Sequence, residues 1–173
     1  MISIGVLMAG VLGLMVFASL ASDAVKAEAK QSEYTGTETV DEIQNEGVWE
    51  PLPNGGKHFR DRVVVHTEYV EGCPRLSGTS TLVMHGKLDP TGTGLVWGTF
   101  ELVVPEGEGC HGGGLWQGTW AGQMSYSENT VYWHGVAQGV SGCVDGLTAI
   151  YDSEVYTPDS PAPYTVTLID PHG

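Results

Sequence analysis

The chain has very little positive charge. It carries 7 Lys and Arg against 21 Asp and Glu in 173 residues, a formal net charge of −14. The shortage is uneven, because residues 105–173 contain eight acids and no Lys or Arg. A surface of this kind repels phosphate backbones. The composition argues against nucleic acid as a partner and predicts a solvated acidic surface, the alternative being a surface that binds cations or a basic partner.

The sequence also lacks the motifs of several familiar sites. The glycine-rich run at 109–114 has neither the lysine nor the following helix that a phosphate-binding loop needs. No calcium loop with ligands at alternate positions occurs, and there is no nucleophile elbow of a hydrolase. These absences favour a non-catalytic role over an enzymatic one, and we predict no cofactor.

A helical hydrophobic stripe is missing outside the N-terminal segment, and short stretches interrupted by glycine take its place. Residues 96–100 (VWGTF), 116–120 (WQGTW) and 132–136 (YWHGV) each combine aromatic or β-branched side chains with a glycine. Such side chains suit a pleated, half-buried surface, and glycine inside a strand marks a bend or a close backbone approach. The pattern predicts a tightly curved all-β fold.

Alternation of residue types with a period of two predicts the strands. The expected strands are 63–70, 79–86, 95–104, 114–124, 130–138, 147–154 and 164–169, with a candidate first strand at 34–40. In the first of these, Val64, His66, Glu68 and Val70 share one face. Seven or eight strands with short connections can close into a barrel or stack as a β-sandwich. We predict a small closed antiparallel β-barrel, because closure removes exposed edges and glycines allow the bending; a sandwich is the alternative.

The longest apolar run lies at the N-terminus. Residues 2–20 carry no charge, and small residues surround Ala21 and Ala24. This is typical of an export signal, although the missing Lys or Arg and the length of the run also fit an uncleaved membrane anchor. We predict an apolar signal or anchor helix at 1–21, an acidic lead-in at 22–54 and an antiparallel β-barrel domain at 55–173. The expected location is periplasmic, extracellular or at the cell surface, with membrane contact only through 2–20.

The three cysteines allow one disulfide and one remaining thiol in an oxidising compartment. If 114–124 and 130–138 form a hairpin that turns at 125–129, Cys110 and Cys143 lie nearly opposite each other at its open end. We therefore predict a Cys110–Cys143 disulfide. Cys73 is expected to be free or to pair between chains.

Aromatic side chains on the predicted strands are candidates for a ligand site. Small barrels offer a mouth, and apolar cavities with few polar groups are the usual form of small-molecule sites. The candidate ligand-binding residues are Trp97, Trp116, Trp120 and His134, and His134 is expected to face Trp120 on the neighbouring strand. Packing in the core is the alternative for the tryptophans, and Trp97 is the strongest surface candidate.

Metal ligation has only weak candidates. A hairpin centred near Arg75 would place His66 opposite His85, and Glu68 could then supply a third ligand. Closely spaced histidine pairs are absent from the sequence. We therefore predict no metal site and regard these histidines and Glu68 as solvated or hydrogen-bonded strand residues.

Several short motifs together resemble a class of uncharacterised bacterial exported β-barrel proteins. They are GTST at 78–81, the Asp-Pro turn at 89–90, WGTF at 97–100, GTW at 118–120, GVAQG at 135–139 and DGL at 145–147. That class is similar to the calycin-like barrels of the allene oxide cyclase and dirigent kind. The resemblance covers about 63–170 and implies a barrel that is often oligomeric. It carries no catalytic or ligand residue over to this chain.

Taken together, these features predict an exported, non-catalytic β-barrel that binds a small apolar or aromatic ligand or mediates contacts at the cell envelope. One alternative is an isomerase or cyclase of the allene oxide cyclase kind, which holds a reactive substrate in the barrel. The other is a structural assembly subunit, such as a homo-oligomer. A solid interior would exclude the enzyme, whereas an apolar pocket beside His134 or Glu68 would favour it.

Overall fold

The chain is built from antiparallel strands, and none of the residues that the structure describes forms an α-helix. The structure is a computed structural model that describes residues 29–156 and 161–172. The elements are β1 (Lys30–Asn45), β2 (Val48–Pro51), β3 (Lys57–Val70), the 3-10 helix η1 (Pro74–Leu76), β4 (Gly78–Leu88), β5 (Thr93–Val104), β6 (Gly114–Ser125), β7 (Thr130–Gly142), β8 (Thr148–Tyr156) and β9 (Ala162–Asp170). No helix in these ranges is long and apolar enough to cross a membrane. The apolar helix predicted at 1–21 lies outside the described residues.

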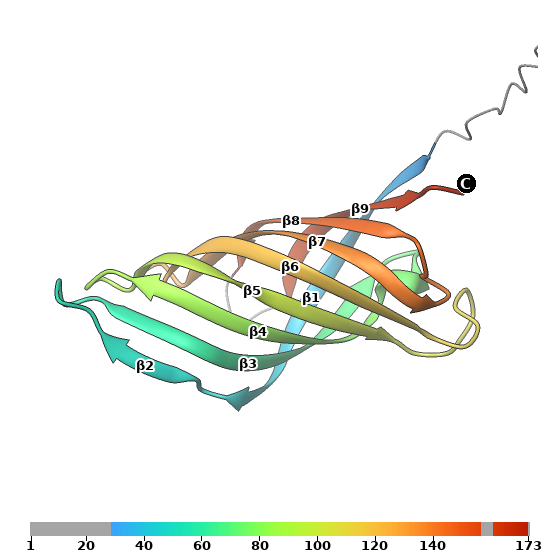
Figure 1. The fold of residues 1–173 in the computed structure, drawn as a ribbon. Helices are drawn as coiled ribbons and strands as arrows, with labels where there is room; N and C mark the ends of the chain where they lie inside the picture. The colour runs from blue at the N-terminus through green and yellow to red at the C-terminus, as the bar shows by residue number, and fades with distance from the viewer. Residues whose placement is uncertain (1–28, 157–160, 173) are drawn as a thin grey trace, which may run out of the picture.

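The nine strands form one antiparallel sheet that closes into a ring (Figure 1). The strand order is β1-β9-β8-β7-β6-β5-β4-β3-β2, and β1 also pairs with β3, so β1 and β3 to β9 complete the ring. β2 pairs with β3 alone and extends the ring at one end, which makes it uneven. The predicted all-β class is confirmed, and a single continuous sheet is not the sandwich of the alternative.

β3 joins two parts of the sheet. Its first residues pair with β2, and from Val63 onward the same edge pairs with β1. Between these parts the ladder to β4 shifts at Phe59 and Arg62, where Asp61 has a φ of 57°. A bulge of this kind bends a strand and increases its twist. The bend lets β1, which comes from the acidic lead-in, lie between β3 and β9.

The interior and exterior faces follow the predicted alternation. Val64, His66, Glu68 and Val70 are buried inside the ring, whereas Tyr69 on the other face is 61% exposed. Successive side chains of a strand point to opposite faces of the sheet, so one buried residue fixes the orientation of the others. His66 and Glu68 share one face of the strand, as the alternation predicts, and the structure shows that this is the buried face.

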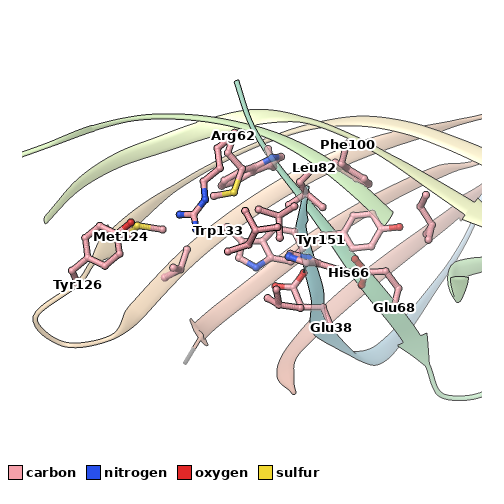
Figure 2. A pocket seen from close by; sticks show the side chains of 17 residues that line it. Glu38, Arg62, His66, Glu68, Leu82, Phe100, Met124, Tyr126, Trp133 and Tyr151 are labelled. Atoms are coloured by element: carbon pink, nitrogen blue, oxygen red, sulfur yellow. Dashed lines mark hydrogen bonds and ion pairs between the residues drawn. The ribbon is translucent and has the colours of Figure 1, made fainter. Parts of the chain in front are cut away.

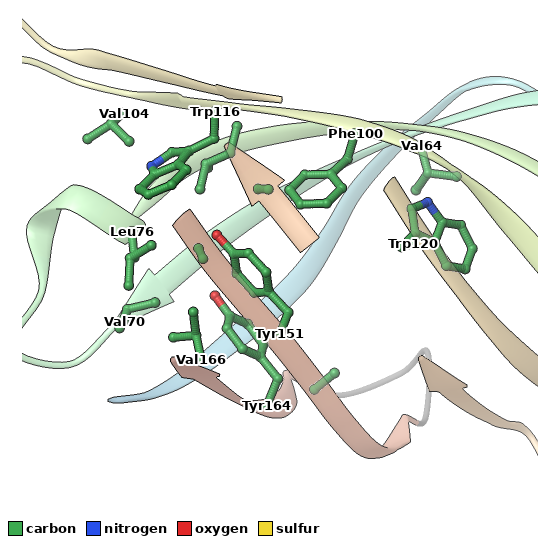
Figure 3. Packing of buried hydrophobic residues seen from close by; sticks show 14 of the residues in the cluster. Val64, Val70, Leu76, Phe100, Val104, Trp116, Trp120, Tyr151, Tyr164 and Val166 are labelled. Atoms are coloured by element: carbon green, nitrogen blue, oxygen red, sulfur yellow. The ribbon is translucent and has the colours of Figure 1, made fainter. Parts of the chain in front are cut away.

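One end of the ring is filled by packed side chains (Figure 3). Leu76 of η1 and Trp116 of β6 are fully buried there, and Trp116 Nε1 donates a hydrogen bond to the Arg75 carbonyl at 2.8 Å. Cys110 and Cys143 form the predicted disulfide, with Cα atoms 5.2 Å apart, in the connections at this end. Cys73 is a free, buried thiol. The other end of the ring is less completely filled.

Candidate functional site

An apolar cavity of about 200 Å³ lies inside the ring. Its walls include Leu82, Met84, Phe100, Trp120, Met124 and Trp133. At its outer end are Ile43 and Tyr126, whose side chains are 41% and 49% exposed. Figure 2 shows Tyr126 at one end of the cavity and Glu68 at the other. The cavity therefore extends from a partly exposed mouth into the interior of the ring.

The inner end of the cavity carries Glu38 from β1 and His66 and Glu68 from β3. Glu38 is directly opposite Glu68 in the ladder, and His66 is two residues before Glu68 on the same face. His66 Nδ1 lies 3.3 Å from Glu38 Oε2, and Ser80 Oγ donates to Glu68 Oε1 at 2.8 Å. All three ionisable side chains are buried, with exposed fractions of 4%, 6% and 8%. The register of the ring thus gathers two acids and an imidazole at one interior point.

Several buried polar atoms at this point lack a hydrogen-bond partner among the described residues. They are Glu68 Oε2 and the hydroxyls of Tyr151 and Tyr164. The Tyr164 ring lies against β1 because the opposite residue is Gly36, where a Cβ atom would come within 2.5 Å of the ring. A buried polar group without a partner costs about 1–3 kcal/mol, so native proteins rarely leave several together. The cluster is suited to bind a further polar group.

The surroundings change the acidity of these groups. Burial and the negative charge of Glu38 raise the pKa of Glu68 to about 7, against the hydrogen bond from Ser80. For His66, burial acts to lower the pKa, but the hydrogen bond to Glu38 and the charges of Glu38, Glu68 and Asp41 outweigh it and raise the pKa. Burial and the charge of Glu68 raise the pKa values of both tyrosines, which remain hydroxyl donors.

The four predicted ligand residues occupy three different places. Trp120 lines the cavity, and Trp116 is part of the packed end of the ring. Trp97 is on the outer face, 36% exposed, with its ring centre 6.2 Å from that of His85. His134 is also on the outer face, where its Nδ1 atom lies 2.7 Å from Asp152 Oδ1. Only Trp120 of this set contacts the cavity.

The expected pairing of His134 with Trp120 is wrong by one residue. His134 is opposite Ala121, and Trp120 is opposite Gly135. A shift of one residue exchanges the two faces of a strand, so His134 points away from the cavity that Trp120 lines.

The expected pairing of His66 with His85 is also wrong. His66 is opposite Ser80, and Glu68 is opposite Gly78, which centres the hairpin on Cys73 rather than near Arg75. His85 lies on the outer face, where its Nδ1 accepts a hydrogen bond from the backbone N–H of Asp61 at 3.3 Å. Of the three weak metal candidates, His66 and Glu68 remain together, and His85 is separated from them.

Sequence reasoning missed Glu38, Tyr151 and Tyr164 as members of the site. For Glu38 the sequence does contain a signal. Glu38 is two residues before Val40 in the candidate strand at 34–40, so the two side chains share one face, and both line the cavity. Comparisons of the chain with family models, with curated proteins and with solved structures find no match.

Proposed function

We propose that the protein is an exported, non-catalytic, calycin-like β-barrel that binds a small apolar or aromatic ligand inside the ring. The observation that carries this proposal is the 200 Å³ cavity with apolar walls and a polar inner end. Small-molecule sites usually combine an apolar lining with a few polar groups that fix the orientation of the ligand. A fully packed interior would have no such space.

The cavity favours a ligand with one polar end. Its volume lies below the range of about 300–1,000 Å³ usual for ligand pockets, so the ligand is expected to have one or two rings. At the inner end, Glu68 Oε2 can accept a hydrogen bond and the Tyr151 hydroxyl can donate one. A hydroxyl group satisfies both partners, so a phenol or a cyclic alcohol is the class of ligand that suits the site best.

Export is supported by two features of the chain. The Cys110–Cys143 disulfide is typical of an oxidising compartment, and the apolar segment 2–20 has the composition of an export signal or anchor. Acids outnumber Lys and Arg by 21 to 7 in the chain, so its charge does not favour a nucleic acid as a partner. A periplasmic, extracellular or cell-surface location is part of the proposal.

The binding role can be tested by calorimetry with 2-naphthol, a two-ring phenol. For a ligand of this size we expect a Kd on the order of 100 μM. Leu82→Trp places a larger side chain in the cavity and should weaken binding by about tenfold or more. The matched control is Leu95→Trp, because Leu95 is on the outer face and 66% exposed. Equal affinities for the two variants, or no binding by the wild type, would refute the proposal.

A cyclase- or isomerase-type enzyme is the second candidate. It is favoured by the Glu68 carboxyl group and Tyr151 hydroxyl at the end of an apolar cavity, where a reactive substrate could be held in one conformation. Native mass spectrometry of the purified chain can identify a bound compound. If the wild type converts that compound and the Glu68→Gln variant does not, the enzyme is supported. If the wild type leaves the compound unchanged, binding alone is supported.

A further inference from the structure

The buried acids of the cavity are arranged in a way that a hydrogen-bonding ligand alone does not explain. Glu38 and Glu68 are directly opposite in neighbouring strands, where two like charges destabilise a sheet. The ligand atoms of Glu38, His66 and Glu68 all lie within 4.8 Å of one another. The cluster holds two carboxyl groups and one imidazole, and all three residues are buried.

A second observation points to a missing partner at the same place. Glu68 Oε2 has no hydrogen-bond partner among the described residues, although Glu68 is only 8% exposed. The hydroxyl of Tyr164, which is 3% exposed, lies beside the Glu68 carboxyl group. Buried carboxylates are normally paired with cations or bound to metals. The unpartnered oxygen belongs to Glu68, whose side chain lies near those of Glu38 and His66 (Figure 2).

We propose that Glu38, His66 and Glu68 bind one divalent transition-metal ion of the zinc type. One imidazole nitrogen and two carboxylate oxygens form a donor set that zinc accepts, with a fourth position left for water or another ligand. Calcium and magnesium suit the site less well, since they require six or more oxygen ligands or retain most of their water.

The geometry allows this ion with small movements of side chains. Metal-to-ligand distances of about 2.0–2.2 Å place ligand atoms roughly 3.4 Å apart in a tetrahedral site. His66 Nδ1 and Glu38 Oε2 are already 3.3 Å apart, and the largest separation in the cluster is below 4.8 Å. All three residues line the cavity, which gives the ion a route from the mouth and leaves its fourth position facing the apolar space. The proposal does not depend on the ligand described above.

The test uses the untagged full chain after treatment with a chelator, titrated with Co²⁺ and then with Zn²⁺. We expect one Co²⁺ per chain, the intense visible absorption of four-coordinate cobalt, and its loss when Zn²⁺ displaces the ion. His66→Gln, Glu38→Gln and Glu68→Gln should each weaken Zn²⁺ binding more than the roughly 100-fold that is typical of an altered outer-shell partner.

The matched control is the double variant His134→Gln with Asp152→Asn, which removes the exposed histidine–carboxylate pair of the outer face. This variant should keep the wild-type affinity for Zn²⁺ and the cobalt spectrum. The proposal is overturned if the wild type binds no Co²⁺ or Zn²⁺, if cobalt shows only the pale spectrum of the hydrated ion, or if the control loses binding. The wild-type titration tests metal binding even if an interior variant does not fold. Binding of 2-naphthol by the chelator-treated chain tests the ligand proposal separately.

Discussion

At the scale of single residues, glycines on the strands make room for aromatic rings inside the ring. Gly36 is opposite Tyr164, and Gly118 is opposite Phe100; a Cβ atom at either position would come within 2.5 Å of the partner's ring. An aromatic ring can therefore lie flat against the neighbouring strand. At Gly36 this places the Tyr164 hydroxyl beside Glu68 and so helps to form the polar end of the cavity.

Gly36→Ala tests this close approach. The added methyl group should displace the Tyr164 ring and lower the free energy of unfolding by about 1–3 kcal/mol, as overpacking of a filled interior does. Urea unfolding of the variant measures the change. Gly107→Ala is the control, because nothing lies within 4 Å of a Cβ atom at that position. If both variants were as stable as the wild type, the position of the Tyr164 ring would not depend on the missing side chain at Gly36.

The residues of the site differ in how well the sequence predicts them. The shared face of His66 and Glu68 follows from a local alternation in the sequence, but that alternation does not say whether the face points into the ring, where both residues are buried. The contact between Glu38 and His66 depends on the pairing of β1 with β3, which are 28 residues apart at this point. No turn sets that register directly, so residue spacing could not identify Glu38 as the partner. His134 was misplaced because an error of one residue is enough to reverse its face.

At the scale of the elements, a disulfide holds the connections at the packed end together. Cys110 lies in the connection between β5 and β6, and Cys143 lies between β7 and β8. The bond closes a segment with a sequence separation of 33 residues. It therefore restricts the unfolded chain around the β6–β7 hairpin, which supplies Trp120 and Trp133 to the cavity.

Removing this disulfide should reduce stability without changing the strand order. For Cys110→Ala with Cys143→Ala we expect a loss of about 2–4 kcal/mol in the free energy of unfolding. Thermal and urea unfolding measure it, and far-ultraviolet circular dichroism checks that the strands persist. Reduction of the wild-type disulfide should produce a similar loss. A double variant as stable as the oxidised wild type would show that the bond does not stabilise the fold.

The turn between β4 and β5 should make stability depend on pH in the acid range. Hydrogen bonds from Thr91 and Thr93 hold the pKa of the exposed Asp89 carboxyl group below its ordinary value of 3.8. Because the folded-state pKa is lowered, the stabilisation is present at neutral pH and is lost as the pH falls through that lowered pKa. Asp89→Asn should be less stable than the wild type at pH 7, and the difference should shrink below about pH 3.8. Unfolding curves across this range would contradict the interpretation if the difference stayed constant.

Most strands were predictable because their alternation is local, and β2 was not. Each of the eight expected strands corresponds to an observed strand, and most observed strands extend beyond the expected ends by one to six residues. β2 has only four residues, all exposed, and it immediately precedes a turn rich in proline and glycine. A strand without a buried face leaves no alternation in the sequence, so only its hydrogen bonds to β3 reveal it.

At the scale of the whole molecule, closure of the ring creates two unlike ends around one interior. The pairing of β1 with both β9 and β3 completes the ring (Figure 1). η1, the disulfide and Trp116, which Figure 3 shows, lie at its packed end. The cavity lies toward the other end, with acids and tyrosines at its inner limit. Closure was predicted from the glycines and strand spacing, but the unequal filling of the interior depends on side-chain packing across all strands. This asymmetry is the basis for proposing a ligand that enters from one end.

The most direct test is a nuclear Overhauser experiment on the wild-type chain with 2-naphthol and labelled methyl groups. Binding inside the ring predicts contacts from the naphthol ring to the methyls of Leu82, Met84 and Met124, all of which line the cavity. The methyls of Leu95 and Val103, which are 66% and 56% exposed on the outer face, should show none. Contacts confined to the outer methyls, or none to the interior methyls at saturating 2-naphthol, would contradict a ligand site inside the ring.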